Sequence, residues 1–157
     1  MKMIFEYVVR MMVGESDEDE LGVLSKIIGA APSISNDDWG DCLYSFASQG
    51  LSIYYSKSQK RYPIAVFRVK EIDLPNWKEG PYDADFPAGI LSSDSRDAVQ
   101  GKLGCIKASC SGTVLIGKRG LKSKTYEDTY EYNSLELKFA FDSISGEMLF
   151  MCLTYRP

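Results

Sequence analysis

The 157-residue sequence contains no histidine. Histidine is the usual base beside serine and cysteine nucleophiles, a common metal ligand, and the side chain that titrates near neutral pH. Its absence therefore excludes Ser-His and Cys-His pairs, histidine-ligated metals and imidazole acid–base chemistry. The remaining composition, 45% hydrophobic and 25% charged, is typical of one folded domain and not of a disordered chain.

Phosphate-binding and metal-binding motifs are also missing. Gly101-Lys102 and Gly117-Lys118 lack the earlier glycine and the following Ser or Thr of a P-loop. No Cys-x-x-Cys pair occurs among the four cysteines, which are Cys42, Cys105, Cys110 and Cys152. We expect structural thiols, no metal and no cofactor, with a disulfide as the less favoured alternative.

Long apolar runs are absent as well. None reaches the roughly 18–20 residues that cross a bilayer, and Glu6 and Arg10 interrupt the apolar start where a signal peptide needs a continuous core. We expect a cytoplasmic protein without a membrane partner. The net charge of −4 argues against a nucleic-acid partner, which requires a basic face.

The N-terminal 30 residues have helical periodicity. The spacing of apolar residues favours a helix over 1–12, although a strand is possible. A second helix is predicted from Ser16, as the N-cap, to a stop at Gly29. Four acids follow Ser16, and acids in a first turn complement the helix dipole. The acidic cluster therefore has a structural explanation beside a role in binding.

Most of the remaining sequence has strand character. Residues 39–69 are predicted to be strand sequence, with apolar alternation at 51–55 and 62–66 and a second strand that continues through Phe67 and Val69. Further strands are predicted at 113–116, 130–141 (with a slip of phase near Ser134) and 148–155. Residues 32–38 are predicted to be loop, and 117–124 a basic turn. A short helix is expected within 92–104, capped by Ser93 or Asp94 and ended by Gly104.

Two parts of the chain match when it is shifted by 86 residues. Tyr44 then falls on Tyr130, Phe46 on Tyr132, Leu51 on Leu137, and Val66 on Cys152. We interpret 42–69 and 130–155 as equivalent ββ units. Since neither can bury its apolar face alone, we predict a single α+β domain over 1–157. Its antiparallel sheet is built from these two hairpin units and packed with the N-terminal helices and the short central helix.

The segment 73–89 is rich in Pro and Gly and is predicted to be a long loop. Long loops inside compact domains are often functional. This one carries Trp77, Tyr82 and Phe86. The aromatic side chains either fold back onto the core or form part of a recognition surface.

The most distinctive stretch runs from Phe86 to Gly104, FPAGILSSDSRDAVQGKLG. Together with GLSIYY at 50–55, it resembles small bacterial proteins that look like immunity partners of polymorphic or contact-dependent toxins. The resemblance covers roughly residues 40–155. It implies a protein that binds a cognate toxin C-terminal domain and occludes its active site.

A mildly acidic protein without a catalytic motif fits such an inhibitor, since an acidic face attracts a basic toxin groove such as that of a nuclease. The candidate partner-binding residues are Asp17, Glu18, Asp19, Glu20, Asp37, Asp38, Trp77, Tyr82, Asp83 and Asp85. No catalytic residue is predicted. The alternatives are a small module that binds an apolar ligand between the hairpins, and a hydrolase that uses paired carboxylates.

Overall fold

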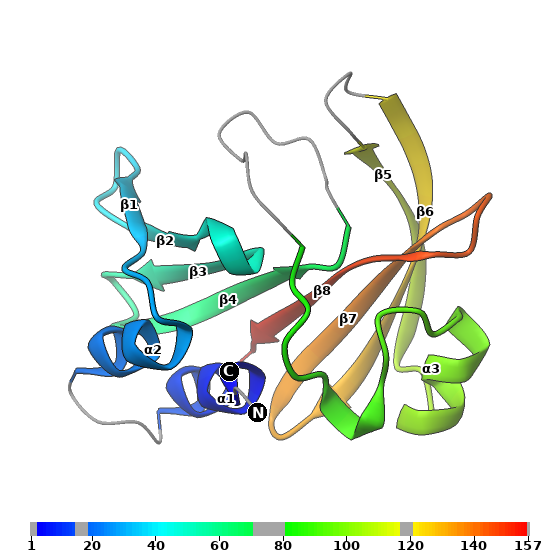
Figure 1. The fold of residues 1–157 in the computed structure, drawn as a ribbon, viewed down its shortest axis with the longest axis horizontal. Coiled ribbons are helices and arrows are strands. Elements are labelled where there is room, and N and C mark those ends of the chain that lie inside the picture. Colours follow the sequence, from blue (N-terminus) through cyan, green and yellow to red (C-terminus); the bar gives the residue numbers. More distant parts are fainter. Residues whose placement is uncertain (1–2, 15–18, 71–80, 117–120, 157) are drawn as a thin grey trace.

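The computed structural model describes residues 3–14, 19–70, 81–116 and 121–156 (Figure 1). The helices are α1 (Ile4–Val13), α2 (Glu20–Ile28) and α3 (Arg96–Leu103). The strands are β1 (Ser33–Asn36), β2 (Cys42–Phe46), β3 (Leu51–Ser56), β4 (Arg61–Arg68), β5 (Ala108–Ile116), β6 (Leu121–Tyr132), β7 (Leu135–Asp142) and β8 (Met148–Tyr155).

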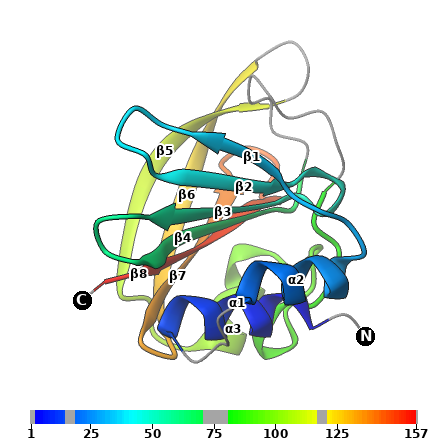
Figure 2. The same cartoon turned by 90° about the vertical axis from the view of Figure 1, so that its left-hand side faces the viewer.

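The eight strands form one antiparallel sheet in the order β1-β2-β3-β4-β8-β7-β6-β5. Figure 2 shows its twist: β1 to β4 lie nearly level in that view, whereas β5 and β6 rise steeply. The helices cover one face, with α1 and α2 beneath the β1–β4 half and α3 beside the other half (Figure 1). The predicted α+β class and antiparallel sheet are confirmed.

The two halves of the sheet meet between β4 and β8. Val66 lies opposite Cys152, the residue that it matches under the 86-residue shift. The strands next to this junction also match: Leu51 on β3 lies opposite Phe67 on β4, and the equivalent Leu137 on β7 lies opposite Leu153 on β8. The register also shifts at equivalent places: after Tyr54 in the β3–β4 pair and after Ala140 in the β7–β8 pair, and these two residues match under the 86-residue shift. A local two-fold axis therefore passes through the Val66–Cys152 pair.

The predicted match fails on the outer strands. Phe46 lies opposite Leu51, and Tyr130 lies opposite Leu137, so Phe46 corresponds to Tyr130 and not to Tyr132. The cause is a difference in connection length. Four residues, 47–50, join β2 to β3 through a 3-10 turn, whereas two residues join β6 to β7. A shift without a gap cannot follow both connections.

The predicted strand over 130–141 is in fact the end of β6, a tight turn, and β7. Asn133 and Ser134 form the turn, with φ of 46° and 66°. Two consecutive positive φ values are typical of the type I′ turn, whose twist suits a two-residue hairpin. The slip of phase near Ser134 was the sequence signature of this reversal of the chain.

Three further boundaries differ from the prediction. Residues 33–36, expected in a loop, form β1, which pairs with β2. β5 begins at Ala108 and not at the predicted Thr113. The prediction missed the first residues of this strand because they are mostly small and polar and show no apolar alternation. Lys122 and Lys124 lie in β6 and not in a turn. All three differences concern edge strands or their neighbours, where backbone pairing extends a strand beyond its apolar part.

The helices form where the periodicity predicts them, with different caps. Asp19, and not Ser16, is the N-cap of α2 and accepts a hydrogen bond from the Gly22 N–H at 3.2 Å. Ser95, and not Ser93 or Asp94, caps α3 by accepting from the Ala98 N–H. Both side chains satisfy a first-turn donor that otherwise has no partner within the helix.

The core lies between the sheet and the helices. One cross-strand row runs along the covered face through Phe46, Leu51, Phe67, Met151, Phe139 and Asp128. The ring of Phe5, on α1, lies 5.3 Å from that of Phe67 and 5.7 Å from that of Tyr132. α1 therefore bridges both halves of the sheet, and burial of its apolar stripe stabilises the helix more than its intrinsic propensity does.

Asp128 is a fully buried carboxylate at the end of this row. Two nitrogens of Arg96, at the start of α3, donate to its oxygens at 2.5 and 2.7 Å, and the Ser109 hydroxyl donates at 2.7 Å. Arg96 also lies 4.9 Å from the ring centre of Tyr126. These contacts tie α3 to β5 and β6. Burial alone would raise the pKa of Asp128, but the hydrogen bonds and the charge of Arg96 lower it.

The lowered pKa of Asp128 predicts a loss of stability in acid. The folded state holds this proton more weakly than the unfolded chain, so the stabilisation is present above about pH 4 and is lost as the pH falls through the folded pKa. Asp128→Asn should reduce the free energy of unfolding at pH 7 by about 2 kcal/mol, because Arg96 loses its ionic partner but stays partly in water. Urea titrations from pH 7 to pH 2 should show a shallower acid decline for this variant. An identical decline in the two proteins would contradict the assignment.

The β6–β7 turn predicts a stabilising substitution. Ser134→Gly should raise the free energy of unfolding by about 0.5–1 kcal/mol, because glycine adopts a positive φ without steric cost. Ser92→Gly is the matched control, since Ser92 is exposed and its φ is not positive. That change should be neutral or destabilising. Urea denaturation of both variants measures the difference, and equal effects would show that the turn is not strained.

Candidate functional site

The predicted contact residues that the structure describes do not form one surface. Asp19, Glu20, Asp37 and Asp38 belong to the β1–β4 half, whereas the other group lies in the segment 81–86, beside the start of α1. Asp17, Glu18 and Trp77 lie outside the described residues. The two groups therefore have to be considered separately.

Tyr82 is a core residue and not part of an exposed surface, contrary to the prediction. Its side chain is 1% exposed, and its ring packs edge-on at 4.9 Å from Phe67 and 5.4 Å from Phe86. Burial, followed by the charge and hydrogen bond of Asp85, raises the pKa of Tyr82 far above its usual value. Of the two alternatives for these loop aromatics, folding back onto the core holds for Tyr82 and Phe86.

Asp85 fixes the start of α1. Both of its carboxylate oxygens accept from the Phe5 N–H, at 3.0 and 3.1 Å, and the Tyr82 hydroxyl donates to its carboxylate at 2.9 Å. A carboxylate here accepts from a first-turn N–H group, and its negative charge interacts favourably with the positive end of the helix dipole. The carboxylate is thus committed to the fold. Asp83, two residues earlier, is exposed.

The β1–β2 turn is held by its own carboxylates. Asp37 Oδ1 accepts from the N–H groups of Trp39 at 3.0 Å and Asp41 at 2.9 Å. Asp41 Oδ1 in turn accepts from the Lys57 N–H at 2.9 Å, which joins this turn to the β3–β4 turn. Gly40 completes the bend with φ of 82°. Figure 2 shows the two turns at the same end of the sheet, on the left.

This fixed turn presents Trp39, whose side chain is 86% exposed. Ile34, on the adjacent edge strand β1, is 62% exposed, and Asp38 is exposed between them in sequence. The prediction of strand structure from residue 39 onward is wrong at Trp39, which lies in the turn between β1 and β2. The available signal was its place within Asp-Asp-Trp-Gly-Asp, where acids and glycine predict a turn whose side chains face solvent.

Charges of both signs surround the β1–β2 turn. Glu20, at the start of α2, accepts a hydrogen bond from the Tyr62 hydroxyl on β4, and burial and then the charge of Glu20 raise the pKa of Tyr62. Asp19 is used as the α2 cap. Lys57 passes over Gly40, and the Arg61 guanidinium lies 3.5 Å from the ring centre of Tyr155. We name Ile34, Asp37, Asp38 and Trp39 the Trp39 surface.

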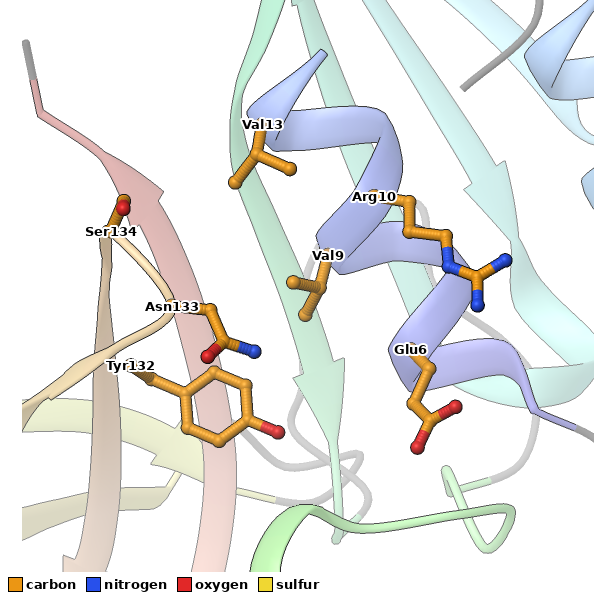
Figure 3. Close-up of a pocket in the computed structure, with 7 residues that line it drawn as sticks. All are labelled: Glu6, Val9, Arg10, Val13, Tyr132, Asn133 and Ser134. Carbon is orange, nitrogen blue, oxygen red and sulfur yellow. The ribbon is translucent and has the colours of Figure 1, made fainter. Parts of the chain in front are cut away.

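A hollow of about 430 Å³ lies between α1 and the β6–β7 turn (Figure 3). Val9 and Val13 point from the helix toward the turn, whereas Arg10 points away from it (Figure 3). Asn133 and Tyr132 contribute polar groups from the strand side. A binding pocket needs polar groups that converge on one ligand. Tyr132 and Asn133 point from the strand side toward the helix, whereas Arg10 points away, so the polar groups that line the hollow do not all converge on one point (Figure 3).

Two of the acids available for carboxylate chemistry, Asp85 and Asp94, already hold backbone and side-chain groups of the fold. Asp94 accepts from the Leu91 N–H at 2.9 Å and pairs with Lys102 at 2.6 Å, so it serves the turn before α3. Asp85 is bound to the α1 backbone, which leaves Asp83 without a free acidic neighbour in the described segment 81–86. Within the described ranges, no cluster of three or more Cys, Asp or Glu is placed to hold a metal ion.

The alternative of an apolar-ligand module requires a cavity between the hairpin units. The units instead lie in one sheet, and side chains from α1 and from the segment 81–90 fill its covered face. A second hollow, of about 740 Å³, is lined by residues 83–86, 89–93 and Gln49. It lies at the surface and includes exposed Asp83 and Ser93. The described part of the chain offers this alternative no enclosed apolar cavity.

No family model matches this chain, and no curated protein or solved structure matches it. Among the helices described, none has the length and apolar character to cross a membrane.

The contacts of Asp85 predict a role in stability. Asp85→Ala should lower the free energy of unfolding by about 1–2 kcal/mol, because the Phe5 N–H loses its carboxylate acceptor and the Tyr82 hydroxyl keeps only its hydrogen bond to the Asp85 backbone carbonyl. The matched control is Asp83→Ala, an exposed carboxylate two residues away, which should change stability by less than about 0.5 kcal/mol. Urea denaturation measures both. Equal effects would show that Asp85 does not anchor α1.

Proposed function

We propose that this protein is an immunity protein, which binds a cognate toxin domain through the Trp39 surface and covers the toxin's active site. One observation carries the proposal: an 86% exposed tryptophan stands on a turn that five hydrogen bonds hold in place. The resemblance of 86–104 and 50–55 to toxin-immunity proteins gives the biological class.

A fixed, exposed tryptophan favours protein recognition for two reasons. Burial of a tryptophan removes a large apolar area from water, and such residues are enriched among the few that dominate binding energy. The turn is already ordered by Asp37 and Asp41, so its backbone loses little conformational freedom on binding. Exposed Ile34 extends the apolar contact along β1.

The acids at this end suit a basic partner. Asp38 is exposed, with Asp37 beside it in the turn. Carboxylates at the edge of an apolar anchor accelerate association with a positively charged groove and discriminate against acidic partners. A toxin that acts on a phosphate backbone presents such a groove. This match gives the acids a role in partner choice, while Trp39 supplies most of the affinity.

The proposal includes no catalytic activity of the chain itself. The buried polar groups described above serve the fold: Asp85 anchors α1, Asp128 holds α3, and Tyr82 packs in the core. Among the exposed large apolar side chains of the described residues, Trp39 is the one aromatic that is more than four-fifths exposed. Inhibition by coverage needs only a surface of this kind.

A binding experiment tests the proposal. The C-terminal domain encoded by the neighbouring gene should inhibit growth when it is expressed alone, and co-expression of the wild-type protein should relieve that inhibition. Trp39→Ala should weaken binding by at least about 30-fold, which corresponds to about 2 kcal/mol. Isothermal titration calorimetry measures the affinity, and co-expression measures protection.

The matched control is Ile144→Ala. Ile144 is also an exposed large apolar side chain, 93% exposed, but it lies in the β7–β8 turn, far from β1 (Figure 1). Its removal should leave the affinity within about twofold of wild type. Absence of both protection and a complex would end the proposed function. Equal losses for the two variants would instead move the binding surface away from Trp39.

A further inference from the structure

The two edge strands of the sheet, β1 and β5, differ in length and in charge. β1 has four residues and β5 has nine. Exposed edge strands invite pairing with other chains, and proteins limit this by shortening them or by placing charges or proline in them. β1 is short and leads into the acidic β1–β2 turn. β5 contains no charged residue and no proline over 108–116, so it lacks all three protections.

The outer edge of β5 is open in the described structure. β5 is the last strand in the sheet order, with β6 as its neighbour. Residues 108–111 and Thr113 are exposed. Backbone N–H and C=O groups along this edge therefore have no strand partner among the described residues. A nine-residue strand is about 30 Å long, which is enough for a full ladder with another strand.

We propose that β5 pairs antiparallel with β5 of a second copy, so that two eight-stranded sheets continue into one. This inference concerns the opposite edge from the Trp39 surface (Figure 1) and does not depend on the proposed function. Antiparallel pairing of identical strands gives a closed two-fold dimer. It leaves β1 and Trp39 of each copy exposed, so the dimer would carry two partner-binding surfaces.

The chemistry of β5 favours its own copy over a foreign strand. In strand addition, backbone hydrogen bonds provide affinity, whereas side-chain pockets select the sequence of the added strand. The described side chains of β5 are Ala, Ser, Cys and Thr, which are small and uncharged and therefore offer little selectivity for a particular foreign sequence. An uncharged strand paired antiparallel with itself also meets no like charge. About an axis at Gly112, Ser111 would lie opposite Thr113 of the second copy.

The chain already contains a junction of this type. β4 and β8 join the two similar halves antiparallel about the local axis at Val66 and Cys152. The proposed contact between copies repeats that arrangement at the sheet edge. It differs in one respect, because the apolar stripe of α1 packs across the β4–β8 junction, whereas the described link between α3 and β5 is polar and runs through Arg96, Asp128 and Ser109. The outer contact should therefore be weaker and dependent on concentration.

Charge placed on both sides of the proposed axis tests it. Ser111→Glu with Thr113→Glu should convert a dimer of twice 17.6 kDa into a monomer, because four carboxylates would face one another across the axis. Within one copy, Thr113 lies opposite Lys124, so the acidic variant retains a favourable neighbour. Sedimentation equilibrium across a range of protein concentrations measures the mass, and circular dichroism monitors folding.

A charge-reversal experiment separates pairing from misfolding. Ser111→Lys with Thr113→Lys should also be monomeric alone, but an equimolar mixture of the acidic and basic variants should form a heterodimer. The control is Ser33→Glu with Ser35→Glu on β1, which should remain dimeric. A monomeric wild-type protein would overturn the proposal, as would loss of dimer in the β1 control or failure of the mixture to pair. None of these results bears on toxin binding.

Discussion

The antiparallel pairing of β4 with β8 is the contact on which the rest of the molecule depends. Each half of the sheet, β1–β4 or β5–β8, presents an apolar face that is too small to be buried alone. Joining the units about Val66 and Cys152 makes one face wide enough for α1 to pack across both. The same junction places β1 and β5 at opposite edges, so the surfaces available for binding follow from it.

The two halves diverge where helices meet them. Tyr44 and Asp128 occupy equivalent positions, opposite Ile53 and Phe139 respectively. Tyr44 is half-buried, whereas Asp128 is buried beneath Arg96 of α3. A buried carboxylate is destabilising unless charge and hydrogen bonds compensate it. Burial of the Asp128 carboxylate is therefore tolerated only when α3 is in place. The same contacts hold α3, whose own apolar content is low, against the sheet.

The sequence predicted the strands that have strong apolar alternation. It did not predict the strands that form through backbone pairing, or which aromatic side chains are buried. The 86-residue match located β3, β4, β7 and β8, because these central strands have strong patterns. It failed at Phe46, where the two connections differ in length. Short polar β1 has no such pattern, and its place follows from backbone pairing with β2. Asp37 and Asp38, two of the predicted contact residues, lie in the turn that carries Trp39, whereas neither the burial of Tyr82 nor the exposure of Trp39 could be predicted without the fold.

The departures from two-fold symmetry indicate where function resides. A symmetric pair of units needs only their shared features to fold, so features present in one unit alone require another explanation. One edge has a short strand and a braced turn that carries Trp39, an arrangement that limits strand pairing and favours side-chain recognition. The other has a long neutral strand, which offers backbone groups and little side-chain selectivity. This division is the basis of our two proposals, recognition of a foreign protein at the β1 edge and self-association at β5, and the β4–β8 junction holds the two edges apart.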